Sequence, residues 1–169
     1  MTLVASFCED GCPVLFGDLL TSGSGERSLS ALPFWQRSDL NIEVKGGLRI
    51  LGTAQKVVVI SDRLCLIWTG AVIEAEAFIR HLRAAEESNP DRSLVDVFNS
   101  YPAEDRKRLE FVAYAREGDA FRQFSTVPSI ELGPFKQLRY EGSGGPAFYD
   151  TISDLNFTRP VPDLSLIHI

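Results

Sequence analysis

The sequence predicts an α+β fold in which antiparallel sheets carry helices on an outer face. Segments rich in β-branched and aromatic residues occupy both ends of the chain, and the one strong amphipathic helical pattern lies between them. Short turn-forming sequences join successive strands of both groups. The order strands, helices, strands is typical of antiparallel sheets rather than of a doubly wound parallel fold. The 169 residues fit a single domain with a sizeable core.

The strands are predicted from β-prone runs bounded by turns. Glu9-Asp10-Gly11 indicates the first hairpin, because Asp-Gly is a strong hairpin signal. Lys45-Gly46-Gly47 and Ser61-Asp62-Arg63 indicate two more turns, and residues 22–39, with Phe34-Trp35, predict a long loop. In chain order the expected strands span residues 2–9, 12–18, 41–43, 48–51, 56–60, 64–68, 109–114, 121–124, 129–132 and 137–140.

The best helix is predicted directly after Gly70. Apolar residues there recur at three- and four-residue steps, which places them on one face, and Asn89-Pro90 ends the pattern. Shorter helices are expected at 94–98 and from Pro102. The apolar face of the long helix consists of Val72, Ala75, Phe78, Ile79 and Leu82.

Composition excludes several classes of function. The formal net charge of −6 disfavours nucleic-acid binding, which needs concentrated Lys and Arg. No run of about 20 apolar residues predicts a membrane helix, and no signal peptide is evident, so we expect a cytoplasmic protein. Three cysteines and two histidines, His81 and His168, make a zinc site or a histidine-based triad unfavourable. We expect no cofactor.

Thr2 is the first candidate for chemistry. A methionine aminopeptidase usually removes Met1 before a residue as small as threonine, which would leave a hydroxyl and a free amine on one residue. An α-amino group has a pKa of about 7.7–8.0, so it can accept the hydroxyl proton near neutral pH. This solution activates a weak nucleophile without histidine. The alternative is that Thr2 only begins a strand.

Further motifs follow Thr2 at defined spacings. Asp18 lies sixteen residues after it, and Gly70 lies fourteen residues after Lys56. The motifs, in chain order, are Thr2, Gly11, Phe16-Gly17-Asp18, Lys56-Val57, Ser61-Asp62-Arg63, the apolar run 64–68, Thr69-Gly70-Ala71 and Gly142-Ser143-Gly144.

In these motifs, over residues 2–18, 53–86 and 138–146, the chain resembles the proteasome β-subunit family of N-terminal nucleophile (Ntn) hydrolases. That family includes the bacterial ring protease that works with an unfolding ATPase. The resemblance implies a four-layer αββα sandwich and a threonine-type peptidase or amidase. It also implies a homo-oligomer, with a ring as one form, that acts on a peptide or amide substrate; an ATPase partner stays unknown.

The resemblance also implies a role for each matched residue. Lys56 would place a cation beside the Thr2 hydroxyl, and Asp18 would pair with Lys56. The Gly70 amide would donate to the oxyanion, Ser143 would hydrogen-bond near the Thr2 amine, and the backbone at Ser22 would hold substrate. The structural alternatives are an Asp18 that ends a strand, an exposed Lys56, a Gly70 that only turns the chain, and a glycine-rich loop at 142–145.

Three departures from the family leave alternatives open. The segment at about 22–50 is an insertion relative to typical members, and the family's later Asp and Ser do not appear beyond residue 150 in the expected context. Residues 164–169 resemble translated adapter DNA, so we expect a C-terminally truncated chain with a non-native tail. The rivals to a peptidase are therefore an inactive structural subunit and a small-molecule amidase of the same fold.

Overall fold

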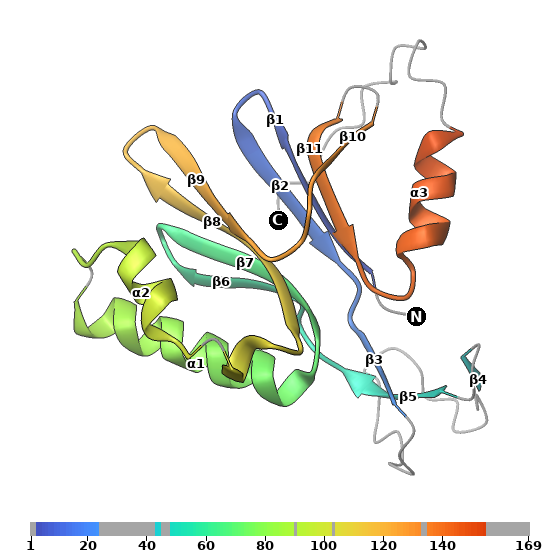
Figure 1. The fold of residues 1–169 in the computed structure, drawn as a ribbon, viewed down its shortest axis with the longest axis horizontal. Coiled ribbons are helices and arrows are strands. Elements are labelled where there is room, and N and C mark those ends of the chain that lie inside the picture. Colours follow the sequence, from blue (N-terminus) through green and yellow to red (C-terminus); the bar gives the residue numbers. More distant parts are fainter. Residues whose placement is uncertain are drawn as a thin grey trace.

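The computed structural model describes residues 3–23, 43–44, 48–89, 91–102, 104–132 and 135–154 (Figure 1). Thr2, Phe34-Trp35 and the tail at 164–169 lie outside these residues. Every pairing between described strands is antiparallel, and helices accompany the sheets, which confirms a mixed α/β fold with antiparallel sheets. The four-layer αββα sandwich stays a prediction.

The first sheet brings the two ends of the described chain together. Its strands are β1 (Val4–Glu9), β2 (Cys12–Gly17), β10 (Ile130–Leu132) and β11 (Phe135–Glu141), in the order β10-β11-β1-β2. The expected first hairpin is confirmed, with positive φ at Asp10 and Gly11 in its turn. Val4 pairs with Gly17 on one side and with Glu141 on the other. The start of β1, the end of β2 and the end of β11 therefore share one edge.

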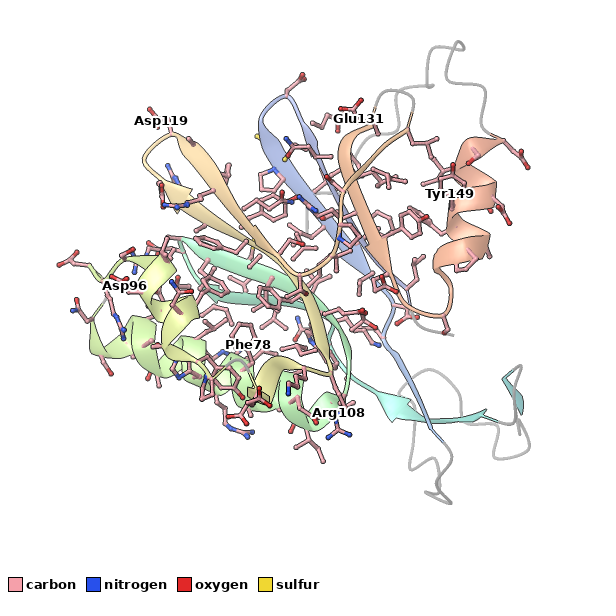
Figure 2. All side chains as sticks on the ribbon, viewed as in Figure 1. Phe78, Asp96, Arg108, Asp119, Glu131 and Tyr149 are labelled. Carbon is pink, nitrogen blue, oxygen red and sulfur yellow. The ribbon has the colours of Figure 1, made fainter. Side chains whose placement is uncertain are left out.

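The second sheet carries helices on one face. Its strands are β6 (Val57–Ser61), β7 (Leu64–Gly70), β8 (Leu109–Glu117) and β9 (Ala120–Ser125), in that order. Between β7 and β8 the chain forms α1 (Val72–Ser88), α2 (Leu94–Ser100) and the 3₁₀ turn η1 (Glu104–Arg106). Phe78 projects from α1 into this core (Figure 2), where its ring centroid lies 5.0 Å from that of Phe111. The apolar stripe predicted for α1 thus does bury its central residues.

The two sheets pack on each other through a second apolar cluster. Val4 from β1, Ile67 from β7 and Val112 and Tyr114 from β8 are all buried in it. On β7 the residues Leu64, Leu66 and Trp68 face the helices, whereas Cys65 and Ile67 face the first sheet. This alternation is what a strand buried on both faces requires.

One helix was not predicted. The sequence predicts no helix after the strand at 137–140, and a glycine-rich loop at 142–145 is only the structural alternative there, but the chain forms α3 (Gly145–Ser153) after a short turn that follows β11. Pro146 fits the first turn of a helix, where its missing N–H costs no hydrogen bond. Phe148 on α3 lies against Phe16 of β2 and Tyr140 of β11, with ring centroids 5.4 and 5.7 Å away. These two aromatic contacts, formed only in the folded chain, hold α3 beside the first sheet.

The prediction of a loop at 22–39 was wrong at its start. Residues Leu20–Gly23 form β3, which pairs with β5 (Leu48–Thr53), and β5 also pairs with β4 (Glu43–Val44) as expected. Gly23 weakened the strand signal there, because glycine is disfavoured within strands. Across the described part of the chain, no helix combines the length and the hydrophobicity needed to span a membrane.

Candidate active site

Asp18 is held against the first described residue of the chain. Because Val4 pairs with Gly17, Leu3 and Asp18 face each other one step beyond the β1–β2 ladder. The Leu3 amide donates to Asp18 Oδ2 at 2.9 Å, and the Asp18 amide donates to the Leu3 carbonyl at 2.9 Å. The carboxylate therefore does more than end a strand, since it binds the peptide group that joins Leu3 to Thr2.

Lys56 is the buried cation of this site. Its side chain is only 3% exposed, so the alternative of a surface lysine is wrong. Lys56 Nζ lies 3.7 Å from Asp18 Oδ1, close enough for strong attraction but longer than a hydrogen bond. Among the described residues, Asp18 Oδ1 is buried with no hydrogen-bond donor. The structure thus brings together the lysine and the aspartate that were predicted to act as a pair. Asp18 Oδ1, which faces Lys56, still lacks a hydrogen-bond donor among the described residues.

Gly17 makes this approach sterically feasible. A Cβ built on Gly17 would lie 3.2 Å from Lys56 Cβ and 3.2 Å from Val4 Cγ1. Contacts of that length are tighter than ordinary van der Waals packing, so a larger residue would push β2 away from the lysine. Close packing against Lys56 and Val4 therefore explains why glycine precedes Asp18, which the sequence motif alone did not show.

Burial and the carboxylate act on Lys56 in opposite directions. Removal of the ammonium from water disfavours its charged form and lowers the pKa of Lys56 below the ordinary 10.5. The negative charge of Asp18 raises the pKa and offsets only part of this effect. The result is a lysine that gives up its proton more readily than an exposed one, beside the carboxylate that binds the Leu3 amide.

Gly70 is fixed by its backbone at the end of β7. It has φ of +102°, a conformation that side-chain-bearing residues rarely adopt. An added Cβ would lie 2.1 Å from the Arg108 carbonyl oxygen, which accepts a hydrogen bond from Ala71 N–H at 3.0 Å. Gly70 ends β7 and immediately precedes Ala71, the N-cap of α1, so it lies just before the helix N-terminus. Whether its amide serves an oxyanion stays a prediction.

The other predicted site residues are placed less directly. Ser143 lies in the turn after β11, at the sheet edge where β1 begins, since Val4 pairs with Glu141. Ser22 belongs to β3 and pairs with Ile50, in the small β3-β5-β4 sheet. Thr2 precedes the described residues. The structure thus joins Asp18 and Lys56 in one contact, and the roles of Thr2, Ser143, Gly70 and Ser22 stay predictions.

Comparisons with known proteins add one finding. No protein-family model and no curated protein matches the sequence. Solved structures do match, and one of them is described as the crystal structure of eukaryotic HslV from Trypanosoma brucei. This chain and that one share 15% identity at a TM-score of 0.46, over 92% of this chain and 81% of that one. A likeness of this degree carries no argument about activity or site.

Sequence reasoning missed one neighbour of the lysine. Trp68 places its ring centroid 5.3 Å from Lys56 Nζ, and its indole Nε1–H donates to the Gln55 carbonyl at 3.0 Å. The sequence could in principle have predicted this neighbour, because the turn at 61–63 sets the register of the two strands and so places Trp68 opposite Lys56. In the sequence alone, Trp68 is one apolar residue in a run of several.

A second polar cluster lies away from this site, where the turn between β6 and β7 meets α1. The Glu86 carboxylate accepts hydrogen bonds from Arg63 Nη2 at 2.6 Å, Arg63 Nε at 2.9 Å and Ser61 Oγ at 2.8 Å. Burial alone would raise the pKa of Glu86, but these hydrogen bonds and the Arg63 charge hold it below its usual value. Every carboxylate oxygen is satisfied, which indicates a structural cluster rather than a reactive one.

Proposed function

We propose that the chain is a threonine-type amidase or peptidase of the Ntn-hydrolase class, with the proteasome-like four-layer fold. The observation that carries the proposal is the position of Asp18. Its carboxylate accepts the amide hydrogen of Leu3 and lies 3.7 Å from the buried Lys56 ammonium. Thr2 is bonded directly to Leu3, so the carboxylate binds the peptide group that carries the proposed nucleophile.

The chemistry follows from the groups assembled there. The Thr2 amine, free once Met1 is removed, takes the hydroxyl proton as the oxygen attacks the carbonyl carbon of the amide. Lys56 stabilises the developing negative charge on that oxygen, and Asp18 orients the ammonium. The Gly70 amide donates to the oxyanion, and Ser143 orders the amine. The amine then protonates the leaving nitrogen, the C–N bond breaks, and water activated by the same amine hydrolyses the acyl ester.

The first test concerns the nucleophile. Intact mass spectrometry of the expressed chain should show that Met1 is absent, because a retained methionine would occupy the amine. Thr2→Ala should abolish amide hydrolysis and labelling by a hydroxyl-directed inhibitor, whereas Thr2→Ser, which keeps a hydroxyl, should retain both. Hydrolysis that survives Thr2→Ala would point to another nucleophile, with Cys8 and Ser143 next, and would refute the proposal. A folded chain that is neither labelled nor active would be the inactive structural subunit.

The second test concerns the lysine and its partner. Lys56→Ala should abolish activity because the hydroxyl loses its cation, and Lys56→Arg should fail as well, since a planar guanidinium cannot replace a compact ammonium at short range. Asp18→Asn should reduce activity less than Lys56→Ala, because the cation remains. A panel of peptides and small acylated amines distinguishes the peptidase from the small-molecule amidase. Near wild-type turnover in Lys56→Ala would show that the lysine has no catalytic role.

A further inference from the structure

The side chains of Lys56 and Trp68 are cross-strand neighbours. Val57 pairs with Ile67, and the Trp68 amide donates to the Lys56 carbonyl at 3.1 Å, which extends the β6–β7 ladder by one residue. Residues directly opposite each other in antiparallel strands project their side chains from the same face. The ladder itself therefore sets the lysine beside the indole, and no loop conformation is needed.

The indole is fixed in place. Its side chain is 2% exposed within the core between the second sheet and the helices, and its Nε1–H is used by the Gln55 carbonyl. A buried tryptophan whose N–H is paired cannot rotate without the loss of both the packing and the hydrogen bond. Trp68 is therefore held in one orientation, with one ring face towards the lysine.

The contact is of a kind that binds a cation. Nζ lies 5.3 Å from the ring centroid, within the range in which an ammonium is attracted by the negative face of an aromatic ring. Asp18 is the charged side chain that faces Lys56 within the described part of the chain, and its Oδ1 lies 3.7 Å from Nζ, which is longer than a well-formed hydrogen bond. A long, flexible lysine in this setting needs a second surface to hold its end.

We propose that Trp68 is a positioning residue for Lys56, whose ring face holds the ammonium toward Asp18 and the beginning of the chain. The proposal rests on the proposed function, because it assigns the lysine a place relative to the nucleophile. Leucine at this position offers no negative face and leaves space for water beside Nζ. Phenylalanine keeps the face and loses only the hydrogen bond to Gln55.

The first experiment reads the contact without activity. The chain has two tryptophans, Trp35 and Trp68, so Trp35→Phe leaves Trp68 as the single indole emitter. In that background the Trp68 emission should titrate as Lys56 loses its charge, with a midpoint below the 10.5 of an ordinary lysine. Adding Lys56→Met should remove the titration. Emission that is flat with pH in the Trp35→Phe protein, or that titrates equally without Lys56, overturns the proposal.

The second experiment uses amide hydrolysis. Trp68→Leu should lower kcat roughly tenfold with little change in KM, and Trp68→Phe should recover most of the loss. Phe98→Leu is the matched control, since Phe98 is a buried aromatic of the same cluster without a contact to the lysine, and it should leave kcat near that of wild type. Equal losses in Trp68→Leu and Phe98→Leu would mean that Trp68 only packs. If Thr2-dependent hydrolysis is absent altogether, the proposed function fails, while the emission titration still decides the contact.

Discussion

At the scale of single residues, Lys56 places a charge where water is almost excluded. Its ammonium has one carboxylate at 3.7 Å and one aromatic face at 5.3 Å, and its side chain is 3% exposed. Burial of a charge costs stability unless partners offset the lost hydration. Here burial is the dominant influence on the pKa of Lys56, and it lowers that pKa. The buried charge of Lys56 therefore lowers the stability of the folded protein, as is common for functional groups.

The pH dependence of the unfolding free energy should reveal the destabilisation caused by the buried charge of Lys56. Because the pKa of Lys56 is lower in the folded protein than in the unfolded chain, the unfolded chain binds more protons between the two values. The destabilisation from the buried ammonium is fully present below the lowered pKa, and it disappears as the pH rises towards 10.5. The unfolding free energy of wild type should therefore rise relative to that of Lys56→Met over this window, as measured by denaturant titrations at several pH values. A difference between wild type and Lys56→Met that stays constant with pH would contradict the prediction.

Gly70 is a second position where one residue type is required. Gly70→Ala should destabilise the protein by more than about 3 kcal/mol, because its Cβ would lie 2.1 Å from a backbone oxygen that cannot move without β8. Gly118→Ala is the control: φ there is also positive, at +64°, but an added Cβ meets nothing within 4 Å. It should cost about 1–2 kcal/mol. Similar melting temperatures for the two variants would show that the Arg108 contact is not restrictive.

At the scale of elements, the position of α1 on the second sheet depends on both apolar and polar contacts. Phe78 and Leu82 are fully buried against the sheet, and burial of such side chains contributes about 1.5–3 kcal/mol each. Near the C-terminus of α1, the Glu86 carboxylate accepts hydrogen bonds from Arg63 and Ser61 and so links the helix to the turn between β6 and β7. The apolar face sets which side of the helix is buried, and the polar cluster fixes its alignment along the strand turn.

Glu86→Gln tests the polar part. The pKa of Glu86 is held below its usual value, so its stabilising contribution is present above the unfolded pKa of about 4.3 and is lost as the pH falls through the folded value. The variant should lose about 2 kcal/mol of unfolding free energy at pH 7, and the difference should shrink in acid. Glu87→Gln, at the exposed neighbour, should change stability little. A Glu86→Gln deficit that persists in acid would mean that the charge is not responsible.

At the scale of the whole molecule, the two four-stranded sheets share a buried polar link within an apolar interface. Tyr114 of β8 is 2% exposed, its hydroxyl accepts a hydrogen bond from Gln123 at 2.6 Å, and it lies 3.4 Å from the Ser6 hydroxyl of β1. Burial raises the pKa of Tyr114, so it stays a neutral donor. The link favours one alignment of the two sheets, and with it the place where the first strand begins.

Tyr114→Phe should therefore weaken the molecule without unfolding it. Loss of the hydroxyl leaves Gln123 and Ser6 with fewer partners in a buried space, which costs about 1–2 kcal/mol. Tyr149→Phe on α3, where the side chain is 39% exposed (Figure 2), should stay within about 0.5 kcal/mol of wild type. Chemical denaturation of the three proteins measures the difference. If Tyr114→Phe is as stable as wild type, packing alone aligns the sheets.

The sequence by itself determined the local features of this protein. The Asp-Gly turn, the strands at 56–60 and 64–68 and the apolar stripe of α1 are recorded in neighbouring residues, because turns and amphipathic periods depend on short-range geometry. The pairing of Asp18 with Lys56 was inferred from motif spacing and resemblance. Thr2, which matters most to the predicted chemistry, lies outside what the structure describes, as do residues 164–169.

The tertiary structure decided what depends on contacts between distant segments. The burial of Lys56, the tryptophan beside it and the need for Gly17 all follow from β2, β6 and β7 meeting at one edge, which no local pattern specifies. The helix α3 was missed because its aromatic residues find their partners on β2 and β11, more than a hundred residues away for Phe16. Register between strands converts a row of ordinary residues into a site, since it fixes which side chains face each other.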